Sequence, residues 1–169
     1  EGMELINYSP FIYAYDAENI GLTGFGVLDG NADCENWWPW NGVNSNLQAL
    51  CNITTAHPGQ AVDLASLTDM VARGVPVEER VFGPNHFLRP QFVQPQRSRN
   101  VLIEGITLRR SPMWILNPVL CENVIIRGVT IESKGPNSDG CDPESSKDVL
   151  IENVNFHTGD DCIAIKSGR

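Results

Sequence analysis

The sequence predicts an all-β fold, a right-handed single-stranded parallel β-helix with a short helical insertion. The main observation is a nine-residue repeat that begins at residues 100, 123 and 148 and reads NVLIEGITL, NVIIRGVTI and DVLIENVNF. Each copy has a β-branched run, a Gly or Asn break and a second alternating run, which is typical of short strands. A period of about 23–25 residues is typical of a solenoid, whose coils bury their apolar faces by stacking on neighbours. A leucine-rich repeat has a similar period, but its fixed leucine spacing is absent and no helix fits between the copies.

The chain is expected to form one incomplete β-helix domain over residues 1–169. An early coil is predicted over 8–30, because residues 19–28 (NIGLTGFGVL) look like a weaker copy of the repeat. Residues 31–98 break the pattern and are predicted to be a loop and helix insertion, and regular coils follow over 99–169. A solenoid that stops without a capping segment leaves its last coil unpaired, so we expect further coils in the intact domain.

Two features are expected within the insertion. Residues 36–42 (NWWPWNG) form an aromatic loop, whose tryptophans could stack on sugar rings but are expected to pack over the end of the β-helix. Residues 63–74 (DLASLTDMVARG) predict a short amphipathic helix that Gly74 ends. The apolar face of this helix is expected to comprise Leu64, Leu67, Met70 and Val71.

Three carboxylates stand in two glycine-flanked turns between the repeats. Asp139 lies in the segment NSDG, and Asp160 and Asp161 follow Gly159. Aligned coil on coil, Met113, Asp139 and Asp161 fall at one equivalent position. Asp139 and Asp161 should therefore lie side by side at the strand spacing of about 4.8 Å, with Asp160 displaced by one residue.

Carboxylates that lie this close raise each other's pKa, so one can stay protonated while its neighbour is ionised. Cleavage of a glycosidic bond needs this pairing, because one acid protonates the leaving oxygen while another carboxylate activates water or attacks carbon. Acidic residues in glycine turns can also be simple solvated turn formers. Their fixed place in the repeat favours the chemical role.

The segments that carry the acids resemble glycoside hydrolase family 28, the polygalacturonases and their relatives. The resemblance is carried by residues 111–114 (SPMW), 137–143 (NSDGCDP) and 159–168 (GDDCIAIKSG). Upstream residues resemble the bacterial and plant-like branch of that family, namely 11–15 (FIYAY), 24–30 (GFGVLDG) and 37–40 (WWPW).

This resemblance implies a parallel β-helix that hydrolyses α-1,4-linked galacturonan with inversion. It implies that Asp160 is the general acid and that Asp139 and Asp161 activate the water. Inverting chemistry uses carboxyl groups about 6.5–9.5 Å apart. The family's Gly-His-Gly and Arg-x-Lys motifs lie further along the chain, so this sequence resembles the N-terminal and central part of the catalytic domain. Asn137 and Lys166 are expected to contact the substrate, a pectic polysaccharide or oligogalacturonide.

The net charge of −9 argues against nucleic acid and anionic membranes as partners. It gives no long-range attraction for an anionic pectin either, so binding would depend on local cations. Lys166 is the first candidate, followed by Arg109, Arg110 and Arg169. No cofactor or metal is expected, and the five cysteines show no metal-ligand spacing.

The cysteines suggest two roles. Cys34 and Cys51 flank a loop and could pair in an oxidising compartment, whereas Cys141 and Cys162 are expected to be small apolar stacking residues in adjacent coils. No hydrophobic stretch is long enough to span a membrane, and no signal peptide is visible. A secreted or periplasmic location is inferred from the substrate, because pectin polymers lie outside cells.

Two other functions suit a β-solenoid. A pectate lyase acts on the same polymer but would need a Ca²⁺ site of several carboxylates and an arginine base. A non-catalytic carbohydrate-binding solenoid predicts that Asp160→Asn changes no measurable property. Attack at the interior or the end of the polymer, and the choice among homogalacturonan, xylogalacturonan and rhamnogalacturonan, stay open.

Overall fold

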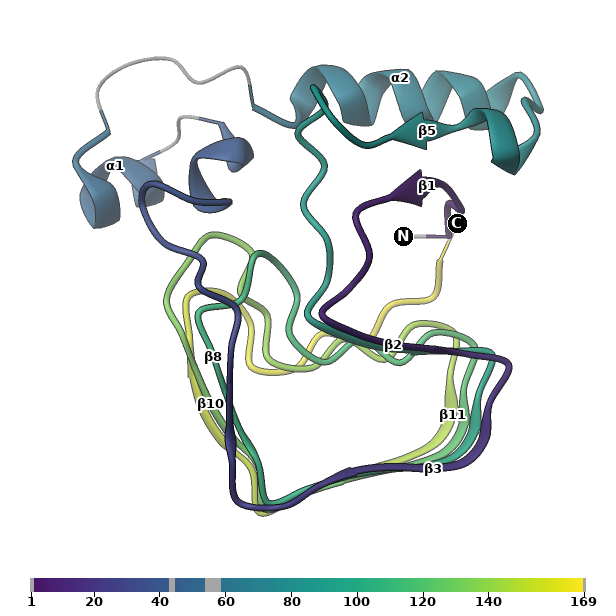
Figure 1. Cartoon of the computed structure of the whole chain (residues 1–169), viewed down its shortest axis with the longest axis vertical. Helices are drawn as coiled ribbons and strands as arrows, with labels where there is room; N and C mark the ends of the chain where they lie inside the picture. The colour runs from purple at the N-terminus through teal and green to yellow at the C-terminus, as the bar shows by residue number, and fades with distance from the viewer. Residues whose placement is uncertain (1, 43–44, 54–58, 169) are drawn as a thin grey trace.

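The computed structural model describes residues 2–42, 45–53 and 59–168 and consists mainly of short strands (Figure 1). The strands are β1 (Ile6–Asn7), β2 (Ile12–Tyr15), β3 (Glu18–Thr23), β4 (Val27–Asp29), β5 (Val81–Phe82), β6 (Val93–Gln96), β7 (Arg99–Glu104), β8 (Thr107–Arg109), β9 (Glu122–Arg127), β10 (Thr130–Ser133), β11 (Lys147–Glu152) and β12 (Asn155–Thr158). The helices are α1 (Ser45–Cys51), α2 (Ala61–Ala72) and the 3₁₀ turns η1 (Trp38–Asn41) and η2 (Val77–Glu79).

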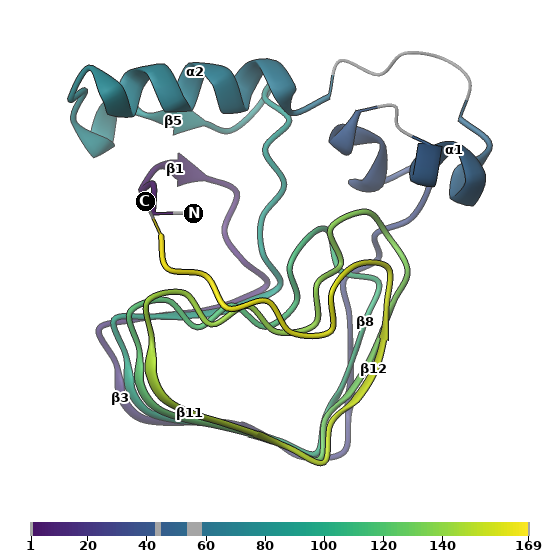
Figure 2. The same ribbon diagram turned by 180° about the vertical axis from the view of Figure 1, so that it is seen from behind.

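The strands wind into a right-handed parallel β-helix, which confirms the predicted fold class. One sheet has the order β11-β9-β7-β3 and a second has the order β12-β10-β8-β4. A third face begins with the pair β2-β6 and continues through single bridges at Leu116, Cys141 and Ile163. Every pairing is parallel, and the coils follow nearly the same outline in both views (Figures 1 and 2).

The first residue of each repeat forms one corner of the coil, which we call the asparagine corner (Asn19, Asn100, Asn123 and Asp148). These four residues have φ values of 57°, 55°, 56° and 54°, a left-handed conformation that Asn and Asp tolerate better than most residues. The amide of Asn100 donates to Asn19 Oδ1 at 2.8 Å, and that of Asn123 donates to Asn100 Oδ1 at 2.9 Å. The first residue of each repeat thus turns the chain, and where it is asparagine, at 19, 100 and 123, its side chain also links successive coils.

The Gly or Asn break inside each repeat forms the next corner, the glycine corner (Gly24, Gly105, Gly128 and Asn153). All four residues have positive φ, and a Cβ on Gly105 would overlap the carbonyl oxygen of Gly24 on the coil before it. The left-handed conformation therefore favours Gly or Asn at this corner on every coil, and at Gly105 the close approach of the preceding coil also excludes a side chain.

Alternate apolar residues of each repeat point into the solenoid and stack in columns. Val101 pairs with Val124, Ile103 with Ile126 and Leu108 with Ile131, and all six are at most 4% exposed. Burial of such a side chain contributes about 1.5–3 kcal/mol to folding, which makes these columns the main source of stability.

The predicted insertion over 31–98 ends earlier than expected. Residues 93–96 form β6, which pairs with β2 from Ile12↔Val93 to Tyr15↔Gln96 and so already belongs to a coil. The run VQPQ has few β-branched residues and contains Pro95, which hid this strand from the repeat pattern. Before it, β5 pairs with β1 and lies together with α2 outside the coils (Figure 1).

The helix predicted over 63–74 is present as α2, and Gly74 follows it with φ 69°. Its predicted apolar face is only partly correct, because Leu67 is buried but Leu64 is 44% exposed. Asp63 is buried instead, where its carboxylate lies 2.7 Å from His86 Nδ1 and accepts from the Phe87 N–H at 2.6 Å. A polar anchor, which periodicity does not reveal, therefore sets the orientation of the helix.

The aromatic loop packs against the solenoid, as predicted, but on its side rather than over its end. The buried Trp38 donates from Nε1 to the Ser111 carbonyl at 3.0 Å and faces Gly135, where a Cβ would overlap its ring. A disulfide between Cys34 and Cys51 connects the segment before the aromatic loop to the last residue of α1. Figure 2 shows α1 above the turns that follow β8 and β12.

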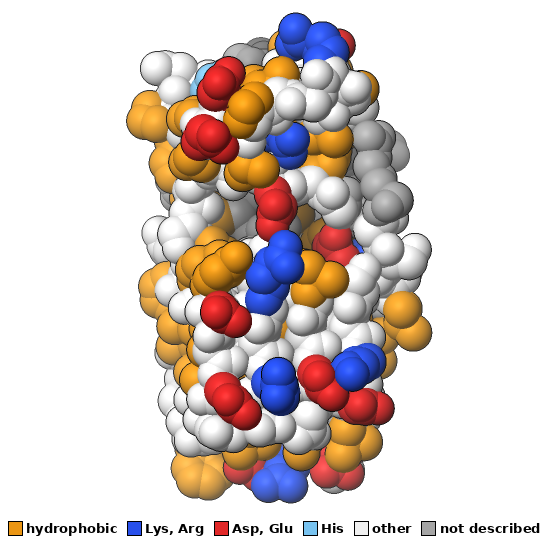
Figure 3. All heavy atoms as spheres, turned by 90° about the vertical axis from the view of Figure 1, so that its right-hand side faces the viewer, with side chains coloured by type: hydrophobic (Ala, Val, Ile, Leu, Met, Phe, Trp, Pro, Cys, Tyr) orange, Lys and Arg blue, Asp and Glu red, His pale blue; other side chains and the backbone are white. Residues whose placement is uncertain are grey.

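The outer surface of the coils carries charges of both signs. Arg127 pairs with Glu104 at 2.7 Å and Lys147 pairs with Glu122 at 2.9 Å, in each case between neighbouring coils. Figure 3 shows basic and acidic side chains interspersed on the side of the solenoid that carries β11. No helix within the described ranges is long and apolar enough to cross a membrane.

Candidate active site

Two turns that follow β10 and β12 bring the acids together, and we call them the acid turns (134–140 and 159–162). The bridges Leu116↔Cys141 and Cys141↔Ile163 fix the register of the coils at this point. The same register places Asp161 beside Asp139, as predicted, and places Trp114 at the equivalent position one coil earlier. The sequence predicted Met113 at this position, which is wrong by one residue, because the repeat does not determine how many residues each turn contains.

Glycines allow the acid turns to stack closely. A Cβ on Gly140 would overlap the Phe156 ring and lie 2.5 Å from the Cys162 carbonyl oxygen, and one on Gly159 would overlap the Gly135 carbonyl. A backbone hydrogen bond of 2.9 Å from Gly140 N to the Asp161 carbonyl joins the two turns. The glycine that follows Asp139 and the one that precedes Asp160 are therefore required by packing.

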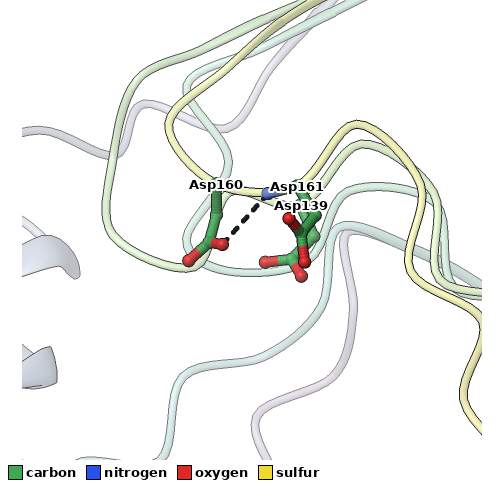
Figure 4. A group of neighbouring side chains, drawn as sticks. All are labelled: Asp139, Asp160 and Asp161. Carbon is green, nitrogen blue, oxygen red and sulfur yellow. Dashed lines mark hydrogen bonds between the residues drawn. The ribbon is translucent and has the colours of Figure 1, made fainter.

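The three carboxylates meet at one point of the surface (Figure 4). One oxygen of each of Asp139, Asp160 and Asp161 lies within 4.8 Å of the others. Asp139 and Asp161 lie together while Asp160 stands apart from them, and its Oδ1 accepts from the Asp161 N–H at 3.0 Å. These nearest oxygens are closer than the 6.5–9.5 Å expected for the carboxyl groups of an inverting enzyme, because Asp160 and Asp161 are neighbours in the chain.

Lys166 lies beside the acids, as expected of a cation near the cleft. Its Nζ is 3.7 Å from Asp139 Oδ2, 3.5 Å from Asp142 Oδ1 and 4.7 Å from the centre of the Trp114 ring. The other expected cations do not reach the site. Arg109 and Arg110 both pair with Asp29 at 2.8 Å, and Arg169 lies outside the described residues.

Asn137 lines a pocket of about 210 Å³ next to the acids. Asp160 lines the same pocket, whose remaining wall is formed by Asn41, Leu47, Leu50, Lys134, Gly135, Pro136 and Gly159. The side chains of the α1 region and of both acid turns therefore enclose one hollow that opens beside Asp160. A sugar ring bound there would lie against the proposed acid.

Arg89 holds this hollow in shape. The buried guanidinium donates to the carbonyls of Pro112 and Pro136 at 3.0 and 2.8 Å, and to the side-chain oxygens of Asn41 and Asn137 at 2.8 Å each. Burial lowers the pKa of Arg89 to about 10, which leaves it charged at neutral pH. Arg89 thus ties the aromatic loop to successive turns of the solenoid.

Two buried carboxyl groups have raised pKa values. Burial raises the pKa of Asp139, the charge of Asp160 adds to the increase, and Lys166 opposes it. Burial raises the pKa of Asp142 to about 8, with Asp139 adding to the increase and Lys166 again opposing it. Burial therefore disfavours the ionised form of both acids, more strongly for Asp142 than for Asp139, and the positive charge of Lys166 partly offsets this effect on each.

The three carboxylates also lie close enough to share a cation. One oxygen from each could reach a single ion, but Asp160 and Asp161 are exposed, and exposed acids often gather without one. Ca²⁺ takes six to eight oxygen ligands, more than one oxygen from each of three carboxylates provides. We therefore assign no metal to this cluster.

Comparison with known proteins supports what the site suggests. Residues 85–169, half of the chain, match the family described as glycosyl hydrolases family 28. The chain belongs to glycosyl hydrolase family 28. A polygalacturonase of Juniperus ashei is 37% identical over 152 residues, which cover 89% of this chain and 23% of that protein. A probable polygalacturonase of Vitis vinifera is 38% identical over 88 residues, which cover 51% of this chain and 18% of that protein.

Solved structures of family 28 agree. The crystal structure of a hyperthermoactive exopolygalacturonase from Thermotoga maritima is 56% identical with a TM-score of 0.91, over all of this chain and 37% of that one. A family 28 exopolygalacturonase of Yersinia enterocolitica, 20% identical with a TM-score of 0.55, covers 88% of this chain and 26% of that one and shares the fold. The chain therefore spans about a fifth of the curated relatives it matches and over a third of the Thermotoga enzyme.

Sequence reasoning missed Arg89 and did not use Asp142 in this family 28 site. Arg89 stands in the segment HFLRP, outside any repeat, and only its folded position shows that it faces Pro112 and the first acid turn at Pro136. Asp142 follows Cys141 inside a recognised motif, so its acidic side chain beside Asp139 was a usable signal. Cys141 is fully buried in the core as predicted, whereas Cys162 is exposed in the last described coil.

Proposed function

We propose that this chain supplies the catalytic acids of a polygalacturonase, which hydrolyses α-1,4-galacturonosidic bonds with inversion. The supporting observation is the convergence of Asp139, Asp160 and Asp161, whose nearest oxygens lie within 4.8 Å of one another on adjoining coils. Family 28 membership and the polygalacturonase relatives point to the same chemistry.

The three acids divide the reaction between them. Asp160 borders the pocket beside Asn137 and stands apart from the other two acids, so it protonates the leaving oxygen. Asp139 and Asp161 lie side by side and activate the attacking water as general bases. Asn137 and Lys166 contact the substrate, because Asn137 lines the pocket next to Asp160 and Lys166 places a positive charge next to Asp139.

We further propose that the enzyme acts on the end of the polymer. The side chains of Leu47 and Leu50, on the α1 region, form part of the wall of the pocket that Asp160 lines, so the insertion limits the space beside the acids. The Thermotoga relative, 56% identical, is an exopolygalacturonase. Chromatography of early products should show one short product accumulating, whereas a ladder of oligogalacturonides would indicate attack in the interior.

The proposed location is outside the cytoplasm. The disulfide between Cys34 and Cys51 suits an oxidising compartment, which is where a pectic substrate would also be met. Fractionation of the source cells, with reduction-sensitive labelling of these cysteines, would test this proposal.

The decisive experiment is release of reducing ends from polygalacturonate by the full-length protein and its Asp160→Asn variant. The variant should lose about 10²–10⁴-fold in kcat, the usual contribution of a general acid or base. Asp148→Asn is the matched control, because it makes the same chemical change at the asparagine corner and copies Asn100 and Asn123. Equal activity of Asp160→Asn and the parent would favour the non-catalytic carbohydrate-binding alternative.

The same assay separates hydrolysis from elimination. A pectate lyase would release an unsaturated product that absorbs in the ultraviolet and would lose activity when calcium is chelated. Hydrolysis should show neither effect. The anomeric form of the first product, followed by NMR, then tests inversion, because an inverting enzyme releases the β-anomer from an α-linked substrate.

A further inference from the structure

Arg89 is a cation beside the active-site pocket whose hydrogen-bonding capacity is fully used inside the protein. Its side chain belongs to a residue that is only 3% exposed. The guanidinium nitrogens donate to five acceptor oxygens, namely the carbonyls of Pro112 and Pro136 at 3.0 and 2.8 Å, the side-chain oxygens of Asn41 and Asn137 at 2.8 Å each, and Gln60 Oε1 at 3.4 Å. A guanidinium has five N–H donors and no acceptor, so these oxygens leave no donor of Arg89 for a ligand.

The guanidinium fixes which way two amide side chains point. Because arginine only donates, the atom of Asn41 and of Asn137 that faces it must be the oxygen and not the nitrogen. Gln60 supports the same orientation of Asn41, since its Nε2 donates to Asn41 Oδ1 at 3.2 Å while its Oε1 faces Arg89. Each asparagine therefore turns its Nδ2 away from Arg89.

The two amide nitrogens are available to the pocket that Asp160 borders. Asn41 lines this pocket from the aromatic loop and Asn137 lines it from the first acid turn, and both residues are half-buried. Within the described ranges, neither Nδ2 donates to another protein group. Once a bound sugar displaces water, an N–H group without an acceptor is costly, so a ligand that offers acceptors here is favoured.

The charges around the pocket favour an anionic acceptor. Lys134 lines the same wall, is exposed and forms no ion pair with a described carboxylate. Hydrogen bonds from N–H donors to a carboxylate are roughly twice as strong as those between neutral groups. Ionised Asp160 would repel a ligand carboxylate, which turns that carboxylate towards the amides and the ammonium and leaves the uncharged oxygens of the sugar facing Asp160.

We propose that Arg89 is a positioning residue that holds two amides, those of Asn41 and Asn137, as donors facing the pocket. With the ammonium of Lys134, these donors bind the carboxylate of a galacturonate unit beside Asp160. Arg89 itself contacts no substrate and acts through the asparagines. The inference deepens the proposed function, on which it rests for the identity of the ligand.

Asn137→Asp removes the donor and keeps the rest of the side chain. Aspartate retains an oxygen facing Arg89, so the contact that ties the turn is preserved, but a second oxygen replaces the N–H group on the pocket side. The affinity for a carboxylate should fall about 10–100-fold, and Asn41→Asp should have the same effect. Asn100→Asp is the matched control, because it makes the same chemical change at the asparagine corner, copies Asp148 and should leave affinity unchanged.

The measurement is calorimetric titration of the full-length protein with two probes, digalacturonate and its methyl ester, whose carboxyl groups carry no charge. An Asp161→Asn background prevents hydrolysis of the probes, and Asp161 is not among the residues that line the pocket. The ratio of the affinity for the acid to that for the ester should fall about tenfold or more in each asparagine variant and in Lys134→Met. A substitution that only loosens the pocket would weaken both probes equally and leave this ratio unchanged.

The role of Arg89 needs a separate variant. Arg89→Lys keeps the charge but has three donors in place of five, so the asparagines are no longer held and the affinity ratio should fall. In the double variant Asn41→Asp/Asn137→Asp, adding Arg89→Lys should lower the ratio no further, because the two oxygens of a carboxylate are equivalent and its orientation no longer matters. Equal falls in both backgrounds would show that Arg89 does not act through the asparagines, and would overturn the positioning role.

The remaining outcomes separate the inference from the proposed function. An affinity ratio that stays unchanged in Asn41→Asp and Asn137→Asp overturns the inference whatever the activity, as does a parent that binds neither probe or prefers the ester. The expected changes in a protein that releases no reducing ends would support the inference and reject hydrolysis. The asparagine variants also keep the binding site testable if Arg89→Lys does not fold.

Discussion

The two corners of the repeat and the two acid turns are built from similar residues but obey different constraints. At the corners, the same or a closely similar residue recurs on every coil with a positive φ, and hydrogen bonds link the three asparagines Asn19, Asn100 and Asn123. In the acid turns, equivalent positions hold Trp114, Asp139 and Asp161, and polar oxygens are buried without hydrogen-bonding partners among the described residues. Repeated residues stabilise the side of the solenoid that holds the corners. On the side that holds the acid turns, different residues occupy equivalent positions, and the proposed catalytic acids are among them.

The contrast has a thermodynamic counterpart. At the asparagine corner, side chains on successive coils hydrogen-bond to each other, and in the apolar columns each buried side chain packs against a similar one on the next coil. Asp139 and Asp142 instead lose hydration on burial and recover it only in part from Lys166. The corners should therefore respond to substitution in stability, and the acid turns in activity and pH dependence.

The largest effect expected from a single change is that of Asp139→Asn. Because Asp139 is a proposed base, kcat should fall by about 10²–10⁴-fold. The free energy of unfolding at neutral pH should stay the same or increase, because the variant buries a neutral amide in place of a carboxylate. Reducing-end assays would measure kcat, and urea denaturation of the same preparations would measure the free energy of unfolding. A marked fall in the free energy of unfolding alongside the fall in kcat would contradict the idea that the acid turns act on activity rather than on stability.

The next largest effect concerns pH. The folded-state pKa of Asp142, about 8, lies above its unfolded value of about 4, so the folded state holds a proton that the unfolded state releases. The stabilisation from this group is therefore complete below about pH 4 and is lost as the pH rises towards 8. Urea denaturation from pH 4 to 9 should show stability falling over this range, and Asp142→Asn should flatten that decline.

This pH effect has a built-in control. Asp148→Asn removes an exposed carboxylate and should preserve the slope seen in the parent protein. An identical slope in the parent and in Asp142→Asn would mean that other groups produce the decline. It would also mean that Asp142 is ionised in the folded state at neutral pH.

A third change tests the repeated side of the molecule. Ile126→Ala opens a cavity at the fully buried Ile126, between Ile103 and the partly buried Ile151, and should cost about 2–5 kcal/mol in the free energy of unfolding. Leu150→Ala is the matched control, since Leu150 lies on the adjoining strand β11 and is itself 47% exposed, so this variant should change stability by less than about 1 kcal/mol. The kcat of the folded fraction should be unchanged in both variants, and a fall in Ile126→Ala alone would show that the core also orients the acids.

The sequence predicted the repeated side well, because most core residues there face the same or a similar apolar residue on the next coil. The repeat starts at 100, 123 and 148 predicted the strands, the break between them and the burial of apolar faces by stacking, and the alignment of the repeats placed Asp161 beside Asp139. The resemblance of the acid motifs added the chemistry that repetition alone does not specify.

What escaped prediction lies where repetition fails. Turn length is set by packing against other segments, so Met113 was placed where Trp114 lies, and β6 was assigned to the insertion. Arg89 and Asp63 act through contacts with residues distant in sequence, which no local pattern encodes. Leu64 was misplaced for the same reason, because the buried Asp63 rather than apolar periodicity orients α2.

The smallest effect isolates a corner from everything else. Asn123 has φ 56° and hydrogen-bonds to Asn100 on the coil before it. Asn123→Ala should cost about 1–2 kcal/mol, because alanine is strained in this conformation and cannot make the bond. Asn123→Gly removes the bond but relieves the strain, so it should recover part of that loss. Thermal denaturation of the three proteins would rank them as Asn, Gly, Ala; if Gly equalled Ala, the hydrogen-bonded ladder rather than backbone conformation would be what selects asparagine at each coil.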